Sequence, residues 1–151
     1  MRYNWKNLNS QQIGTFAEYF VKMELTMHGF QVYTTEVDDR GIDFVTRYET
    51  QPFVSVQVKS ILRANYVFLR KDKFALSKDM ILALVLFQEG SEPGLYFIPS
   101  SVWKSPNALF VSRDYIGKKS APEWGLNISQ KNMPLLEQYS FDRMMEKLKT
   151  T

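Results

Sequence analysis

Two stretches, Gly41-Ile42-Asp43-Phe44-Val45 and Val54-Ser55-Val56-Gln57-Val58-Lys59, predict a β-hairpin that decides the fold. Both alternate along the chain, and a period of two places successive side chains on opposite faces of a strand. The segment 48–52 between them is the expected turn. In a register centred on that turn, Asp43 lies directly opposite Gln57, and such cross-strand neighbours have Cβ atoms roughly 5 Å apart.

The two faces of this hairpin differ in polarity. One face gathers the carboxylate of Asp43, the amide of Gln57 and the ammonium group of Lys59. The other face is apolar and is expected to point into a core. Its predicted members are Ile42, Phe44, Val54, Val56 and Val58.

Length and composition restrict the class of protein. The 151 residues fit a single domain spanning 1–151, and 44% hydrophobic residues suffice for an ordinary core. The absence of Cys excludes disulfide scaffolds, thiolate zinc sites and Cys nucleophiles, and one His leaves little for a Ser–His–Asp triad. The net charge of +3 weakly favours a polyanionic partner.

No membrane association is predicted. The first residues lack the apolar core of a signal peptide, and the longest apolar run, 80–87, is far shorter than the ~20 residues that span a bilayer. We therefore expect a soluble cytoplasmic protein.

The elements around the hairpin predict an α/β (α+β) fold with one mixed sheet and flanking helices. An amphipathic helix is expected over 10–28, with Asn9 and Gln12 forming a capping box. The run 80–87 predicts a fully buried central strand. The remaining expected elements are strands at 31–37, 65–69, 95–98 and 107–111, a polar turn at 38–41, an edge strand at 124–128 and a closing helix at 134–149.

The polar face of the hairpin has the chemistry of a divalent-metal site. Asp43 and Gln57, with the backbone carbonyl of Val58, offer the hard oxygen atoms that Mg²⁺ or Mn²⁺ prefers. Lys59 is placed to orient a water or to neutralise charge on a phosphate, and Glu18 of the preceding helix offers a second acid through a bound water. Metal-assisted phosphodiester cleavage needs a Lewis acid, an activated water and nearby positive charge.

These residues, in this order, resemble the PD-(D/E)xK nuclease superfamily, which has the restriction-endonuclease-like fold. The resemblance rests on Glu18, on Gly41-Ile42-Asp43 and on Gln57-Val58-Lys59-Ser60, and it covers the first 60 residues best. Within the superfamily the chain looks closest to the Mrr-like and Holliday-junction-resolvase-like branch. The resemblance implies a mixed central sheet flanked by helices. It also implies a catalytic set of Glu18, Asp43, Gln57 and Lys59, and metal ligands at Asp43, Gln57, Val58 and Glu18.

Two positions depart from the literal motif. Ile42 stands in place of its proline, which is common in this branch. Gln57 stands in place of an acid, which removes one negative charge from the metal site and is expected to lower metal affinity.

The expected partner is DNA, either duplex or branched, and a homodimer is expected by analogy alone. Basic residues are frequent over 59–78, where Tyr66 and Phe68 are interleaved, and they recur at Arg113, Lys118 and Lys119. Cations near phosphates supply affinity without sequence preference, and aromatic rings stack on bases. The alternative is a catalytically inactive nuclease-fold domain that acts as a nucleic-acid-binding or scaffold module.

Overall fold

Two β-sheets form the framework of the protein. The structure, a computed structural model, describes residues 2–37, 40–63 and 65–150. Within these residues the main sheet has five strands in the order β1-β2-β3-β5-β6, and a second sheet has three in the order β4-β8-β7. The strands of the main sheet are β1 (Phe30–Thr34), β2 (Phe44–Tyr48), β3 (Val54–Ile61), β5 (Met80–Leu86) and β6 (Gly94–Pro99). Those of the second sheet are β4 (Tyr66–Arg70), β7 (Phe110–Arg113) and β8 (Glu123–Asn127).

The main sheet is mixed. Strands β3 and β5 run parallel, whereas β1–β2, β2–β3 and β5–β6 are antiparallel. Every residue of β5 is buried, and its alternate side chains enter two separate cores, with Ile81 in one and Leu82 in the other. The predicted mixed central sheet flanked by helices is therefore confirmed, whereas the expectation that all strands join one sheet is wrong.

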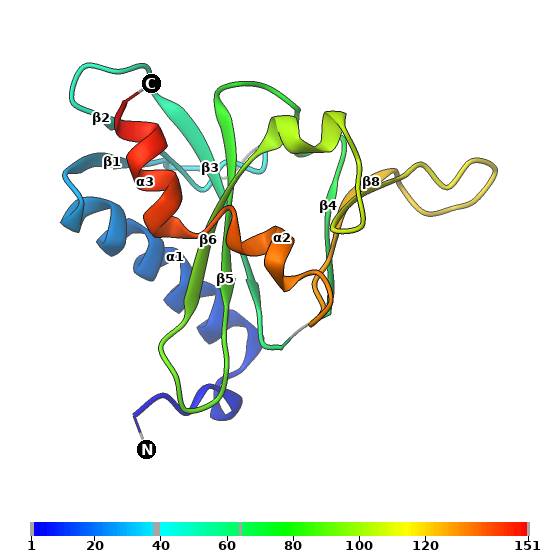
Figure 1. The fold of residues 1–151 in the computed structure, drawn as a ribbon, viewed down its shortest axis with the longest axis horizontal. Helices are drawn as coiled ribbons and strands as arrows, with labels where there is room; N and C mark the ends of the chain where they lie inside the picture. Colours follow the sequence, from blue (N-terminus) through cyan, green and yellow to red (C-terminus); the bar gives the residue numbers. More distant parts are fainter. Residues whose placement is uncertain (1, 38–39, 64, 151) are drawn as a thin grey trace.

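Helices cover one face of the main sheet. Helix α1 (Ser10–Met27) and helix α3 (Phe141–Lys149) share a core with β2, β3 and β5, on the side away from β4 and β8 (Figure 1). The predicted capping box is present, because Asn9 Oδ1 accepts from the Gln12 N–H at 2.8 Å and Gln12 Oε1 accepts from the Asn9 N–H at 3.0 Å. No helix in the described part of the chain is long and apolar enough to cross a bilayer.

The second sheet covers the opposite face of the main sheet. It joins the 3₁₀ helix η2 (Ser100–Lys104) and the short helix α2 (Met133–Glu137) in a second core. A further 3₁₀ helix, η1 (Trp5–Asn7), precedes α1. Strand β8 lies between β4 and β7, so the prediction that it forms an edge is wrong.

The C-terminal helix predicted over 134–149 is also wrong, because the chain breaks into α2 and α3. The break is held by the main sheet, where the Phe97 N–H donates to the Tyr139 carbonyl at 2.8 Å and Tyr96 forms a bridge with Ser140. Tyr139 and Ser140 therefore pair with the edge strand β6 instead of continuing the helix.

The hairpin forms in the predicted register. Phe44 pairs with Val56 and Val45 with Ser55, as expected for a turn centred on 48–52. Phe44 and Val56 lie in the helix-side core as predicted. Ile42, however, packs against the second core, so its predicted place on the same face is wrong. The reason is that β2 begins only at Phe44. The polar turn predicted at 38–41 includes Asp38 and Asp39, which lie outside the described residues.

Candidate active site

Asp43 lies where β2 and β3 separate. Its N–H donates to the Val56 carbonyl at 2.9 Å, and its Oδ2 accepts from the Val58 N–H at 2.7 Å. The pairing of the two strands ends at Phe44 and Val56. The Asp43 carboxylate thus accepts from the Val58 N–H in place of a backbone carbonyl of β2, which does not extend this far. A charge-assisted bond of this kind fixes the side chain in one orientation.

The side-chain oxygen of Gln57 is buried and accepts no hydrogen bond from the described residues. The pairing register, continued by one residue, places Gln57 opposite Asp43. Among the described residues no hydrogen-bond donor reaches its Oε1, although that atom is buried. Leaving a buried acceptor unsatisfied costs about 1–3 kcal/mol, so the position of this amide is unfavourable unless something binds its oxygen.

Gly41 and the turn after β4 enclose this amide. A Cβ added to Gly41 would lie 2.9 Å from Gln57 Oε1 and would overlap the carbonyl oxygen of Lys73. Gly41 has a φ of +72°, which disfavours other residues. Glycine therefore lets the Lys73 backbone approach the oxygen atoms of the candidate site, a contact that the sequence did not reveal.

Lys59 lies two residues beyond Gln57 on β3 and hence on the same face. It is partly buried. Within the described residues its ammonium group forms neither an ion pair nor a hydrogen bond. Partial burial keeps the positive charge close to the sheet surface.

Glu18 lies in the helical layer, on α1, and not on the sheet that carries Gln57 and Lys59. It projects from α1, which packs on the helix-side core, and it forms an ion pair with Lys22 at 3.1 Å. Lys22 also lies 3.3 Å from Thr34 Oγ1 and 5.6 Å from the centroid of the Phe44 ring. Lys22 thus connects Glu18 to the start of β2, next to Asp43. The sequence signal for this residue is its i, i+4 spacing from Glu18.

The oxygen atoms of Asp43 and Gln57 are of the chemical type that a hard cation prefers. No group of three or more His, Cys, Asp and Glu residues in the described ranges is arranged to hold a metal ion. Oxygen atoms of this type are offered by the Asp43 carboxylate and by Gln57 Oε1, which meets no donor within the described ranges. Mg²⁺ retains several waters and is commonly bound through one or two carboxylates. Val58 donates its N–H to Asp43, and the role of its carbonyl stays a prediction.

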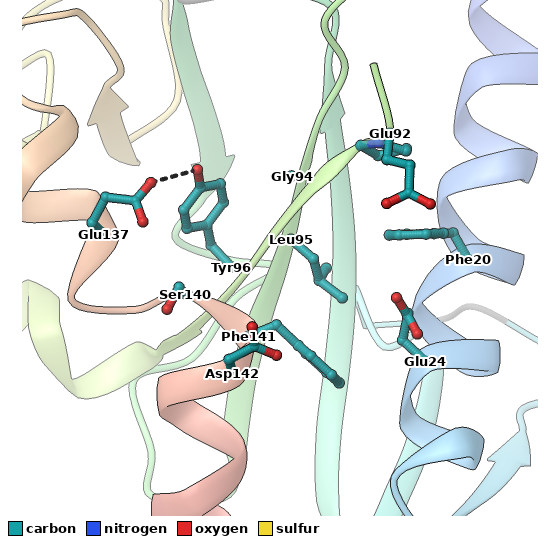
Figure 2. A pocket seen from close by; sticks show the side chains of 11 residues that line it. Phe20, Glu24, Glu92, Gly94, Leu95, Tyr96, Glu137, Ser140, Phe141 and Asp142 are labelled. Carbon is teal, nitrogen blue, oxygen red and sulfur yellow. Dashed lines mark hydrogen bonds between the residues drawn. The ribbon is translucent and has the colours of Figure 1, made fainter. Parts of the chain in front are cut away.

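A cavity of about 270 Å³ lies elsewhere, beside β6 (Figure 2). Its lining combines Phe20 and Phe141 with four carboxylates, those of Glu24, Glu92, Glu137 and Asp142. In this cavity the Tyr96 hydroxyl donates to Glu137 at 3.0 Å (Figure 2). Burial, and then the Glu137 carboxylate, raise the pKa of Tyr96 to about 12. The clustered negative charge repels phosphate, so this cavity is no candidate for nucleic acid.

The mixed five-stranded sheet, with Asp43 directly before β2 and with Gln57 and Lys59 on β3, has the restriction-endonuclease-like fold. Among solved structures the chain is similar to the Holliday junction resolvase Hjc of the archaeal hyperthermophile Archaeoglobus fulgidus. The TM-score is 0.56 and the sequence identity 14%, and the match covers 88% of this chain and 95% of that chain. The resemblance predicted from the sequence is thereby confirmed for the fold. No protein-family model matches the chain, and no curated protein matches its sequence.

Proposed function

We propose that the protein is a metal-dependent endonuclease that hydrolyses phosphodiester bonds in DNA. One observation carries the proposal. Where β2 and β3 separate, the Val58 N–H holds the Asp43 carboxylate in place, and a buried Gln57 oxygen without a donor from the described residues lies on the neighbouring strand. Lys59 follows on the same face as Gln57. The fold, shared with a resolvase, supports the same reading.

Each residue has a distinct role in this proposal. Asp43 and Gln57, with the Val58 carbonyl, would hold Mg²⁺ or Mn²⁺. When bound, the ion supplies Lewis-acid activation of the phosphate and of a water. Lys59 orients the attacking water and stabilises the charge that grows on the phosphate oxygens. Glu18 acts from the other layer through a bound water, with Lys22 holding its carboxylate.

The substrate is DNA, and branched DNA is the first form to test, because the similar solved structure is a Holliday junction resolvase. Dimerisation through a second copy of the chain is an expectation by analogy alone.

Isosteric substitutions test the proposal. Asp43→Asn still accepts from the Val58 N–H but loses its charge, and Lys59→Met keeps the length of the side chain without the ammonium group. We expect each to lower Mn²⁺-dependent cleavage of duplex and four-way-junction DNA by about 100-fold or more, the loss typical of removing one charge-stabilising group. The control is Lys104→Met, an exposed lysine of η2. Cleavage that survives both site substitutions would overturn the proposal.

A second candidate function is a DNA-binding module without catalysis. It is favoured by Gln57 in the place of an acid, and by the lack of a three-ligand His, Cys, Asp or Glu cluster among the described residues. This candidate predicts salt-dependent DNA binding that divalent ions and Asp43→Asn leave unchanged. Metal-dependent cleavage by the purified wild-type chain, lost in Asp43→Asn, would exclude it.

A further inference from the structure

The outer face of the second sheet carries aromatic rings and a cation. Leu69 of β4, Phe110 of β7 and Leu126 of β8 point into the second core. Because side chains alternate along a strand, Tyr66 and Phe68 of β4, Arg113 of β7 and Gly125 of β8 point outward. The pairing places Phe68 directly beside Gly125. We call Tyr66, Phe68, Arg113 and Gly125 the aromatic platform.

Gly125 makes the platform flat. A Cβ added there would overlap the Tyr66 hydroxyl oxygen and lie 2.5 Å from ring atoms Cε1 and Cζ. The Tyr66 ring therefore rests directly on the Gly125 backbone. A side chain at this position would lift the ring away from the sheet, and glycine in the interior of a central strand is otherwise unfavourable.

The Tyr66 ring is fixed from several sides. Its hydroxyl donates to the buried Glu123 carboxylate. The Arg113 guanidinium lies 4.4 Å from the ring centroid. The Phe68 ring follows at 6.4 Å with an interplanar angle of 20°. A surface of rings held in place in this way binds a flat partner at little cost in side-chain entropy.

Phe68 is half exposed, at 50% of the reference area of the residue. Burying a Phe side chain stabilises a protein by about 1.5–3 kcal/mol, so leaving this one in water on a flat sheet gives up stability. Phe68 and Tyr66 lie nearly parallel, which is the arrangement that stacks planar groups on a sheet.

The charges near the platform favour a polyanion. Among the described residues Arg113, Lys118 and Lys119 form no ion pair, whereas the neighbouring acids are engaged, Glu123 by Tyr66 and Asp72 by Arg70. Lys118 and Lys119 lie on the β7–β8 loop, which extends away from the body of the molecule (Figure 1). Cations beside planar rings complement phosphates and bases together.

We propose that the aromatic platform binds single-stranded DNA, with a base stacked on the exposed Phe68 ring beside Tyr66 and with phosphates near Arg113, Lys118 and Lys119. Unpaired bases are required, because in a duplex the faces of the bases are covered by their neighbours. Strand β4 leads from the platform to the turn whose Lys73 carbonyl contacts Gly41, beside the candidate active site. The proposal rests on the proposed function for the choice of DNA, and it specifies substrates with an unpaired arm.

The test measures binding without cleavage, in chelator, by fluorescence anisotropy of the full chain. The probes are a labelled oligothymidine of about 12 nucleotides, within the 4–16 nucleotides typical of such surfaces, and a duplex of equal length. Phe68→Ala is expected to weaken binding of the single strand by about ten-fold, the lower range for loss of one stacked base. Phe68→Trp is expected to retain it.

The chain offers a matched control. Phe53 is 43% exposed and lies 4.5 Å from the Arg47 guanidinium and 5.6 Å from the Tyr33 ring, but it lies in the β2–β3 turn. Phe53→Ala is expected to bind the single strand like the wild-type chain. Two results would overturn the proposal. One is an equal loss of affinity for the single strand in Phe53→Ala and Phe68→Ala, and the other is an equal loss of affinity for duplex and single strand in Phe68→Ala.

These results are separable from the proposed function. Asp43→Asn is expected to bind oligothymidine normally in chelator, because Asp43 is not part of the platform. Failure of Phe68→Ala to weaken binding would leave Asp43-dependent cleavage of duplex DNA untouched. Absence of cleavage in every variant would refute the nuclease while leaving the binding result standing.

Discussion

Replacing Gly41 with Ala tests whether the Lys73 backbone closes over the candidate active site. The substitution has two costs. The first is the left-handed backbone at φ +72°, about 1–2 kcal/mol for a residue with a Cβ. The second is the overlap of the new Cβ with the Lys73 carbonyl oxygen, together with contacts of 3.3 Å to the Lys73 carbonyl carbon and 2.9 Å to Gln57 Oε1. Crowding of this kind costs about 1–3 kcal/mol, because a backbone carbonyl cannot rotate away like the end of a side chain.

Gly117 in the β7–β8 loop separates the two costs. Its φ is +74°, and no described atom lies within 4 Å of a Cβ added there. Gly117→Ala therefore carries the first cost alone. Urea denaturation followed by circular dichroism should show a free energy of unfolding lowered by about 1–2 kcal/mol in Gly117→Ala and by about 2–5 kcal/mol in Gly41→Ala.

The Gly41→Ala variant should also lose metal-dependent cleavage, measured well below its denaturation midpoint, because the Gln57 oxygen must move. Equal destabilisation in the two variants would refute the reasoning, since it would mean that the Lys73 carbonyl moves aside without cost.

Three further changes have defined outcomes. Gln57→Glu adds a charge beside the proposed metal site. At about 4 Å from a divalent ion in water this charge is worth about 2 kcal/mol, and titration with Mn²⁺ should show binding about 30-fold tighter. In the folded wild-type chain the pKa of Tyr96 is raised to about 12, so its hydroxyl stabilises the fold fully below pH about 10 and loses this effect as the pH rises toward about 12. Tyr96→Phe has no such group, so its free energy of unfolding should fall less between pH about 10 and about 12, as denaturation at several pH values would show. Asn9→Ala removes the capping box of α1 and should lower the free energy of unfolding by about 1 kcal/mol in urea.

Local signals accounted for the parts of the fold that were predicted correctly. Asn9 and Gln12 marked the start of α1, and the unbroken apolar run of β5 marked a strand buried on both faces. Alternation set the register of the hairpin, because slipping by one residue would expose Val56. The same alternation placed Gln57 and Lys59 on one face.

The parts that failed depend on partners distant in sequence. Tyr66 pairs with Asn127, and nothing near Tyr66 identifies that partner, so the second sheet was not separated from the first. The break between α2 and α3 depends on Tyr139 meeting β6, whereas apolar spacing alone continued the helix. Ile42 continues the alternation in the sequence, but β2 begins only at Phe44, after Asp43, whose carboxylate accepts from the Val58 N–H on the partner strand.

The candidate site shows the same difference between local and distant signals. The amide at position 57 can be read from the sequence, but the burial of its oxygen, which meets no donor from the described residues, involves Gly41 and the distant Lys73 backbone. Lys22 needed both the helix spacing and the position of Phe44 to be linked with the candidate site.

The position of β4 has a consequence for the order of folding. This strand lies within the connection between the parallel strands β3 and β5, yet its pairing partner is β8, formed by residues far along the chain. Contacts of long sequence separation form late, because the intervening loop must first be closed. During synthesis all strands of the main sheet therefore emerge before residues 123–127, and until then β4, with Tyr66 and Phe68, is an unpaired edge. Such an edge is prone to aggregation, so a chain that stops before Glu123 should be recovered in inclusion bodies.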